Sequence, residues 1–210
     1  MKTIFKSTVV LVAITLIAGL ALATVYEVTK EPIASAEKTA RENAYRMVLP
    51  DALSFIATGI PEQSLYPVEV ENSVRINACL VGVAHEDPMS ALSMSAVNPI
   101  VGYVVNVTSP NGYGGDITLA VGILTDGSVS GVSVISQSET AGLGAKCADK
   151  AFTDQFVGIM GPIEYVKGGK SEPNQIDAIS GATVTTRAVT EAVNAAQAHV
   201  QERILTEEGD

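Results

Sequence analysis

An uninterrupted apolar segment near the N-terminus is the feature that most constrains how this chain of 210 residues can fold. No charged residue occurs from Ser7 to Tyr26, and valine, leucine, isoleucine and alanine dominate the segment. A helix of about 20 residues is roughly 30 Å long, which matches the hydrocarbon core of a bilayer. We therefore predict a single transmembrane helix at residues 7–27, preceded by a short cytoplasmic N-terminus at residues 1–6.

The charges that flank this segment predict its orientation. Lys2 and Lys6 precede it and Glu27 follows it, so the positive-inside rule places the N-terminus in the cytoplasm and the rest of the chain outside. The alternative is a cleaved signal peptide, since Ala21-Leu22-Ala23 resembles a cleavage site. The apolar run continues through that site, which favours an inner-membrane anchor. Either way, the folded part is extracytoplasmic.

A helical pattern follows the apolar segment. Beyond Pro32, apolar residues recur at three- and four-residue steps with charged residues on the other face, and Pro50 ends the pattern. We predict a stalk at residues 28–50, in which a separate helix begins at Pro32. One exported domain is expected at residues 51–206, followed by an acidic tail at residues 207–210.

Alternating residues predict an antiparallel sheet in the exported domain. Strands are expected at residues 74–84, 102–107, 117–123 and 129–135. A hairpin turn at Asp126-Gly127 joins the last two. Residues 54–71 are expected to form a loop with a short strand, and residues 85–98 a loop or brief helix. With amphipathic helices predicted around residues 148–157 and after Thr183, the fold class is α+β.

Charge and cysteine content exclude some functions. The net charge of −10 argues against a nucleic-acid partner, because phosphates would be repelled. The two cysteines, Cys79 and Cys147, and the two histidines, His85 and His199, are isolated in the sequence. A structural zinc or iron–sulfur site requires about four such ligands, so none is expected. A Cys79–Cys147 disulfide and two buried thiols are both compatible with an exported domain.

Four segments are rich in glycine, serine and threonine. They are Gly112–Gly115, Ser138–Gly144, Gly168–Lys170 and Asp177–Thr183. The third is interpreted as a turn only. In the second, the two glycines that flank Leu143 would allow a flat ligand to approach the backbone. The fourth runs directly into the final helix.

The start of that helix has two interpretations. Ser180 or Thr183 could be an N-cap, since both residue types are preferred there. A helix N-terminus preceded by small residues is equally a phosphate site, because free backbone N–H groups and the positive end of the helix dipole face the anion. Arg187 would lie one turn further on the same face and could pair with a phosphate.

These segments, in this order, resemble an FMN-binding domain shared by two membrane complexes. One is the Rnf ion-translocating ferredoxin:NAD oxidoreductase, through its G subunit, and the other is the Na+-translocating NADH:quinone reductase, through its C subunit. The family pattern Asp-x-x-Ser/Thr-Gly-Ala-Thr fits Asp177 to Thr183 at every position, and Gly112 to Gly115 match its Gly-Tyr-Gly-Gly segment. Its Glu-Thr-Pro-Gly-Leu-Gly loop fits Glu139 to Gly144, with Ala141 in place of proline.

The resemblance implies a flavoprotein that carries FMN covalently. Thr183 would bear the cofactor through a phosphoester, which makes it a phosphorylated residue. Its phosphate contacts would come from Ser180, Gly181, Ala182 and Arg187. The flavin ring would lie against Glu139, Thr140, Gly142, Leu143 and Gly144. A separate Mg2+-dependent flavin transferase that uses FAD is implied, with Asp177 and the Ser-Gly-Ala-Thr loop as its recognition site.

The resemblance also implies partners and a role. The chain would pass electrons as a subunit of an ion-translocating oxidoreductase of the Rnf type, anchored in the cell membrane beside other subunits. It has no nicotinamide-binding fingerprint, so it is not expected to be an autonomous catalyst. The alternatives are the quinone-reductase counterpart, which the compact length and the Thr29–Ile33 and Leu49-Pro50 matches disfavour, and a cofactor-free anchored binding module.

Overall fold

The structure is a computed structural model that describes residues 2–57, 68–84 and 100–207. The chain forms two compact units, Met1–Ala40 and Arg41–Asp210. The predicted loop or helix at residues 85–98 and residues 208–210 of the predicted tail lie outside the described residues.

Helix α1 (Lys2–Val48) is continuous and contains Pro32. The prediction that a separate helix begins at Pro32 was therefore wrong. A proline inside a helix removes one backbone hydrogen bond. Ser35 Oγ donates to the Pro32 carbonyl oxygen (2.9 Å) and Thr29 Oγ1 to the Val25 carbonyl oxygen (2.8 Å), so side chains add local bonds on both sides of the proline.

The first unit contains one helix that is long and apolar enough to cross a membrane. Its large apolar side chains are at least 50% exposed: Val9, Val10, Leu11, Val12, Ile14, Leu16, Ile17, Leu20, Leu22 and Val25. Inside this stretch, Thr15 Oγ1 donates to the Val12 carbonyl oxygen (3.0 Å) and Thr24 Oγ1 to that of Leu20 (2.8 Å). Both hydroxyls are satisfied within the helix, as an apolar environment requires.

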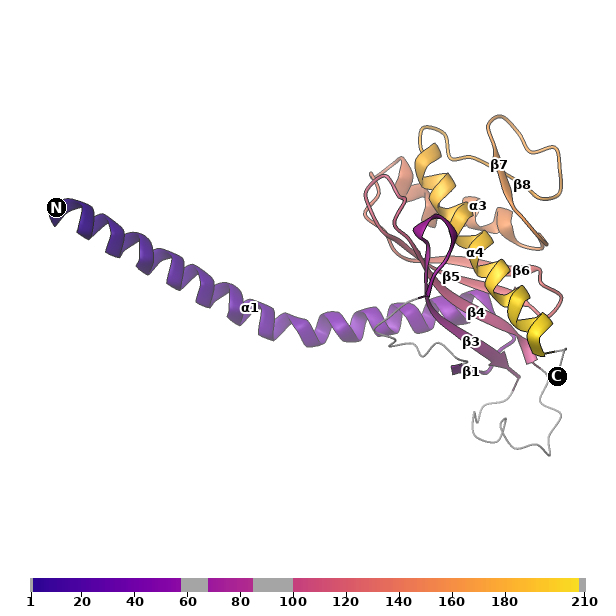
Figure 1. Cartoon of the computed structure of the whole chain (residues 1–210), viewed down its shortest axis with the longest axis horizontal. Coiled ribbons are helices and arrows are strands. Elements are labelled where there is room, and N and C mark those ends of the chain that lie inside the picture. Colours follow the sequence, from indigo (N-terminus) through magenta and orange to yellow (C-terminus); the bar gives the residue numbers. More distant parts are fainter. Residues whose placement is uncertain (1, 58–67, 85–99, 208–210) are drawn as a thin grey trace. The chain divides into compact units, whose positions relative to one another are not determined.

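The second unit is built on a six-stranded antiparallel sheet (Figure 1). Its strands are β1 (Ser54–Ala57), β2 (Val68–Glu69), β3 (Arg75–Val83), β4 (Ile100–Ser109), β5 (Ile117–Leu124) and β6 (Val129–Ser136). The order is β1-β3-β4-β5-β6, with β2 also paired to β3. A 3-10 turn, Glu71–Ser73, separates β2 from β3. The four predicted strands and the α+β class are confirmed.

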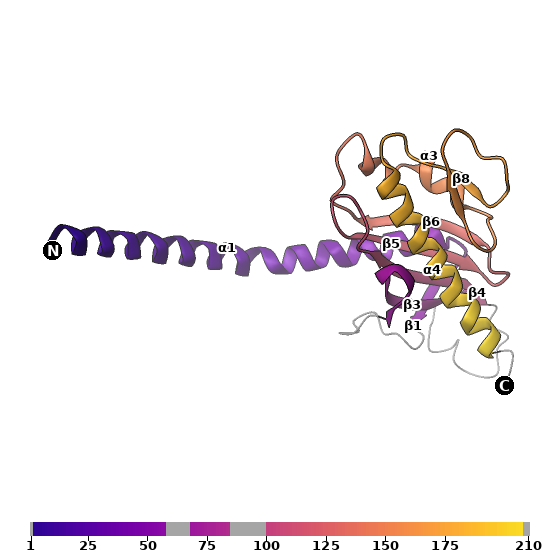
Figure 2. The ribbon, with the colours of Figure 1, turned by 45° about the horizontal axis from the view of Figure 1, so that its top comes forward.

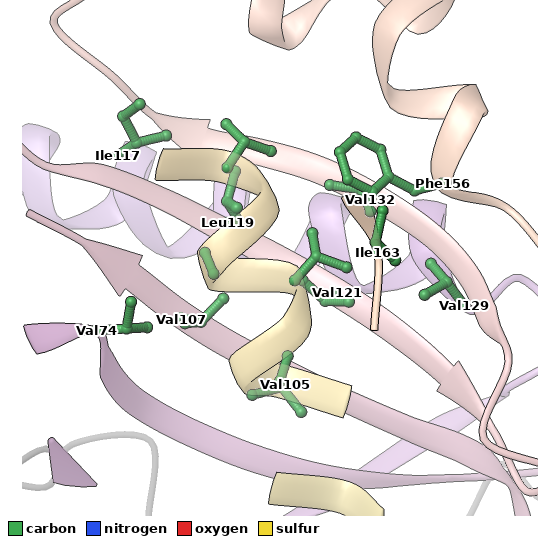
Figure 3. Close-up of a cluster of buried hydrophobic side chains, with 14 of the residues drawn as sticks. Val74, Val105, Val107, Ile117, Leu119, Val121, Val129, Val132, Phe156 and Ile163 are labelled. Atoms are coloured by element: carbon green, nitrogen blue, oxygen red, sulfur yellow. The ribbon is translucent and has the colours of Figure 1, made fainter. Parts of the chain in front are cut away.

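Helix α4 (Thr183–Glu207) lies across one face of this sheet (Figures 1 and 2). The alternating residues of β4 and β5 that face it are branched and apolar, and Val105, Val107, Leu119 and Val121 point toward α4 in Figure 3. All four are 0% exposed. The helix contributes small residues, including Ala188, Ala192 and Ala196, to the same core, which allows its backbone to approach the sheet closely.

The end of α1 covers part of the opposite face. Ala44, Tyr45, Val48 and Leu49 pack against Ala78, Leu80, Val104 and Ala120. Glycines in the strands make room for this contact. A Cβ added at Gly122 would collide with the Val48 carbonyl oxygen, and one at Gly131 would lie 3.0 Å from Val48 Cα. Ser130 Oγ donates to the same carbonyl (2.5 Å) and so satisfies a carbonyl at the end of α1.

The helix predicted around residues 148–157 is broken. The chain forms a 3-10 turn at Gly144–Ala148, the four-residue α3 (Lys150–Thr153) and another 3-10 turn at Asp154–Phe156. A parallel pair that was not predicted follows, β7 (Glu164–Val166) and β8 (Gln175–Asp177). The turn expected at Gly168-Gly169 lies between them, and both glycines have positive φ.

The glycine contact with α1 generates a graded prediction. Gly122→Ala should destabilise the second unit by about 1–3 kcal/mol, the usual cost of overpacking, because the new methyl meets backbone. Gly131→Ala, against the same residue of α1, should cost less because its nearest neighbour is 3.0 Å away. Calorimetric unfolding of the full-length protein in detergent measures both. If both substitutions lowered the free energy of unfolding equally, or if Gly122→Ala did not lower it, the close contact between the sheet and the end of α1 would be contradicted.

Candidate functional site

The loop that precedes α4 is held by a residue inside the helix. The Ile179 amide donates to Thr186 Oγ1 (3.0 Å), and that hydroxyl donates to the Ala182 carbonyl oxygen (3.0 Å). The Ala182 amide donates to the Ile179 carbonyl oxygen (3.0 Å), which closes a turn. Gly181 has φ +77°, a conformation that glycine adopts without strain. These bonds give the Ser-Gly-Ala-Thr segment a defined shape.

The N-terminus of α4 has unpaired backbone donors. Among the described residues, no group accepts a hydrogen bond from the amides of Thr183, Val184 or Thr185, and the first helical bond runs from Thr186 to Ala182. Neither Ser180 nor Thr183 caps the helix through its hydroxyl, so the N-cap interpretation is not supported. The half-buried Thr183 hydroxyl likewise has no partner within the described ranges. Three N–H groups and one hydroxyl are thus available at the positive end of the helix dipole.

Asp177 precedes this loop at the end of β8. Gln155 fixes its backbone, because the Asp177 amide donates to Gln155 Oε1 (2.8 Å) and Gln155 Nε2 donates to the Asp177 carbonyl oxygen (3.4 Å). Its Oδ1 is buried and has no hydrogen-bond partner in the described part of the chain. A buried carboxylate oxygen without a donor is costly, so Asp177 retains an acceptor for a group that binds here.

Glu139 joins the other two predicted motifs to the helix. Its side chain is 9% exposed. One carboxylate oxygen accepts from the Gly114 amide (2.8 Å) and the other from Thr185 Oγ1 (2.5 Å). The segments Gly112–Gly115 and Ser138–Gly144 and the first turn of α4 therefore meet at one carboxylate.

Glycines leave room for this carboxylate. A Cβ at Gly112 would lie 2.8 Å from Glu139 Oε1. One at Gly144 would collide with Glu139 Oε2 and lie 2.7 Å from Thr185 Oγ1. At Gly114, an added Cβ would collide with the Ser138 carbonyl oxygen. Gly144, one of the two glycines predicted for ligand approach, and the glycines of the 112–115 segment thus permit close packing between the segments.

The loop after Glu139 presents an apolar side chain at the site. The amides of Leu143 and Ala145 donate to the Thr140 carbonyl oxygen (3.1 and 3.2 Å), and Gly142 has φ +77°. Leu143 is 46% exposed, and a Cβ at Gly181 would lie 3.3 Å from its Cδ2. Leu143 therefore borders the Ser-Gly-Ala-Thr loop.

Two more exposed apolar side chains belong to the same segments. Tyr113 is 75% exposed and Val184 is 39% exposed. One lies in the glycine segment bound to Glu139 and the other follows Thr183. Both side chains therefore belong to segments that Glu139 joins.

Arg187 is placed differently from the other predicted residues. Its side chain is 51% exposed, and Nε lies 3.9 Å from Glu191 Oε1, one helical turn further from Thr183. Glu191 also accepts from Asn111 Nδ2 (3.0 Å). The ion pair thus draws the guanidinium away from the Asp177–Thr183 loop, and its phosphate contact stays a prediction.

Cys147 lies in the core behind the site. Burial, followed by the nearby Glu139 carboxylate, raises the pKa of this thiol to about 11. The thiol is therefore protonated at neutral pH and a poor nucleophile. Cys79 and Cys147 are both buried thiols that form no disulfide in the structure, as the second of the two cysteine interpretations expects. Over the described ranges, no group of three or more His, Cys, Asp or Glu side chains could hold a metal.

Three residues of the site were not predicted: Gln155, Thr185 and Thr186. Each acts through a hydrogen bond to a residue distant in sequence or to backbone. The only local signal for two of them was that Thr185 and Thr186 closely follow Thr183, so that polar residues recur at the start of the helix.

The site coincides with matches to known proteins. The family described as FMN-binding domain matches residues 112–198, and the RnfG N-terminal region matches residues 1–48. The chain is 33% identical to the G subunit of the Na(+)-translocating ferredoxin:NAD(+) oxidoreductase complex of Acetobacterium woodii, over 92% of this chain and 89% of that protein. It is 30% identical to the G subunit of the ion-translocating oxidoreductase complex of Aliivibrio fischeri, over 98% and 96%.

A solved structure is also similar. The crystal structure of Shewanella oneidensis NqrC superposes with a TM-score of 0.47 and 23% sequence identity, over 71% of this chain and 66% of that chain.

The hydrogen bonds of Thr186 generate a prediction. Thr186→Val should cost about 1–3 kcal/mol, because it leaves the buried Ile179 amide without an acceptor. Hydrogen exchange at the Ile179 amide should become faster. Thr190→Val is the matched control: the Thr190 hydroxyl donates only to the Thr186 carbonyl oxygen of the same helix (2.9 Å), so its loss should be nearly neutral. Equal effects of the two variants would show that Thr186 does not hold the loop.

Proposed function

Because the chain belongs to the family of G subunits of ion-translocating oxidoreductase complexes, we propose that it is the membrane-anchored electron-transfer subunit of such a complex, with FMN attached covalently to Thr183. The FMN-binding domain match covers Gly112–Gly115, Ser138–Gly144 and the first turn of α4. As one subunit among others, it passes electrons and is not a complete catalyst.

The observation that carries the attachment site is the state of the α4 N-terminus. The Thr183 hydroxyl has no partner among the described residues and is half-buried rather than enclosed. The amides of Thr183, Val184 and Thr185 have no protein acceptor in the described chain. A phosphoester at this hydroxyl would receive donors from the helix amides and be favoured by the helix dipole.

Each residue of the loop has a role in this proposal. When bound, FMN supplies the redox chemistry, which the side chains of this site lack. Ser180, Gly181 and Ala182 hold the phosphate end, with the shape of their segment maintained by Thr186. Arg187 would have to leave its 3.9 Å pair with Glu191 to reach the phosphate, and an exposed pair of this kind is weak enough to allow that.

The ring end is proposed to lie against the loop that follows Glu139. Leu143 supplies an exposed apolar surface next to Gly181, and Gly142 and Gly144 keep the backbone open there. Thr140 organises the turn through its carbonyl oxygen. Glu139 stays behind this loop, because both of its carboxylate oxygens are bonded within the protein.

Attachment requires a second enzyme. No side chain bonded to Thr183 is present to act as a base within the described residues, so we propose that a flavin transferase moves the FMN half of FAD to Thr183 Oγ1, with release of the adenylate half. Asp177 is proposed as part of its recognition site, because it precedes the Ser-Gly-Ala-Thr loop and its backbone is fixed by Gln155.

Two alternatives are less well supported. The C subunit of the quinone reductase would have the same chemistry, but residues 1–48 match the RnfG N-terminal region and the relatives are named as G subunits. A cofactor-free binding module would not account for the FMN-binding domain match. The proposed partners are accordingly the other subunits of an Rnf-type complex, and no nucleic acid.

The attachment site is tested by fluorescence. Full-length protein coexpressed with a flavin transferase should give a fluorescent band after denaturing electrophoresis, and mass spectrometry should find FMN minus water on the Thr183 peptide. Thr183→Ala should abolish both signals with unfolding unchanged, whereas Thr183→Ser keeps the hydroxyl and should retain part of the modification. Fluorescence that persists in Thr183→Ala would refute the assignment.

The sidedness is tested by reporter fusions. Lys2 and Lys6 before the apolar stretch and Glu27 after it favour an extracytoplasmic flavin domain. Alkaline phosphatase fused after Glu207 should be active, and a fluorescent protein that folds only in the cytoplasm should stay dark at the same position. The reverse pattern would place the domain in the cytoplasm. Replacing both lysines by glutamate should lower the alkaline phosphatase activity of the fusion, because fewer molecules would insert with the N-terminus in the cytoplasm.

A further inference from the structure

Glu139 is an unusual residue for the interior of a protein. Within the described ranges it is the only acidic residue that is buried as a whole, although one carboxylate oxygen of Asp177 is also enclosed. No basic side chain of the described chain forms an ion pair with it. Its two oxygens are satisfied by one amide and one hydroxyl instead. Burying a carboxylate without a cation is costly, which points to a functional constraint at this position.

The bonds of Glu139 determine how the segments of the site meet. Gly114 is 25 positions away in sequence and Thr185 is 46 positions away. Thr185 lies in the first turn of α4, two residues after Thr183. The carboxylate therefore joins two parts of the site. One is the glycine segment 112–115, and the other is the first turn of α4, which carries the unpaired amides.

The charge of Glu139 is oriented toward this helix start. Thr185 Oγ1 lies 2.5 Å from one of its oxygens, so the carboxylate lies against the turn that begins at Thr183. Reduction adds negative charge to a flavin, and a buried carboxylate near it opposes that addition, because Coulomb energies are large where water is excluded.

From these observations, and resting on the proposed function, we propose that Glu139 is the positioning residue of the flavin site. Its hydrogen bonds hold the Gly112–Gly115 segment and the first turn of α4 in the arrangement that accepts the cofactor. Its buried negative charge makes the bound flavin harder to reduce. Geometry and charge are separate contributions, and two substitutions separate them.

Glu139→Gln retains the geometry and removes the charge. The amide oxygen can accept from the Gly114 amide, and the amide nitrogen can donate to Thr185 Oγ1. Flavin attachment in full-length protein should stay within about twofold of the unsubstituted protein, since both hydrogen bonds are kept. Potentiometric titration should give a more positive midpoint potential. An unchanged or more negative potential would overturn the electrostatic part of the proposal.

Glu139→Ala removes both bonds. Attachment of FMN to the purified apo-protein by the transferase should slow by roughly tenfold or more, the factor expected for the loss of a hydrogen bond to a charged group. Gln197→Ala is the matched control. Gln197 is also buried and links α4 to other parts of the domain, through the Gly127 and Ile159 carbonyl oxygens, but it lies outside the segments that meet at Glu139, so attachment and potential should be unchanged. Attachment at the normal rate in folded Glu139→Ala would overturn the positioning role.

A milder pair of variants applies if calorimetry shows that Glu139→Ala does not fold. Thr185→Val removes one donor to the carboxylate, whereas Thr190→Val removes a hydroxyl that bonds only within α4. Slower attachment in the first alone supports the proposal, and equal rates overturn it. If the unsubstituted protein never acquires FMN, the proposed function fails instead, which distinguishes the two failures.

Discussion

Burial of both faces of the central strands is the constraint on which the rest of the second unit depends. Alternate residues of β4 and β5 belong to two separate cores, one beneath α4 and one beneath the end of α1. The face under α4 is filled by branched side chains that meet small helix residues. The face under α1 is flattened by glycines such as Gly82 and Gly122, whose added Cβ atoms would meet α1 or the residues just after it. This arrangement makes the last turns of α1 part of the domain core.

The functional site is held by polar contacts where this apolar packing ends. The start of α4 is fixed by Thr186 to its own preceding loop and by Thr185 to Glu139. Gln155 fixes the strand end at Asp177. Each contact satisfies buried polar atoms and so defines one loop conformation, since the alternative conformations would leave those atoms unpaired. The amides of Thr183, Val184 and Thr185 remain available, because none of these side chains accepts a hydrogen bond from them.

Local patterns predicted some elements well and others poorly. Strand β5 was predicted because its apolar residues alternate, and β6 because the chain returns after a turn with Asp126-Gly127. The segment 148–157 has an equally good helical period, yet forms only short turns. Immediately after it, the Val129 amide donates to the Ile159 carbonyl oxygen (3.1 Å) and the Gly158 amide donates to the Val129 carbonyl oxygen (2.8 Å). These hydrogen bonds join the end of the segment to β6, and no local pattern encodes them.

The sequence by itself determined the apolar segment that can span a membrane, the main strands, and the segment that carries Thr183, because each depends on neighbouring residues. Only the tertiary structure decided that two glycine-containing segments and the first turn of α4 meet at Glu139, and that Gln155, Thr185 and Thr186 support the site. These contacts join residues up to 46 positions apart, and their geometry follows from how α4 lies across the sheet. Composition and periodicity do not predict which distant residues come into contact, so the roles of Gln155, Thr185 and Thr186 could not be predicted from the sequence.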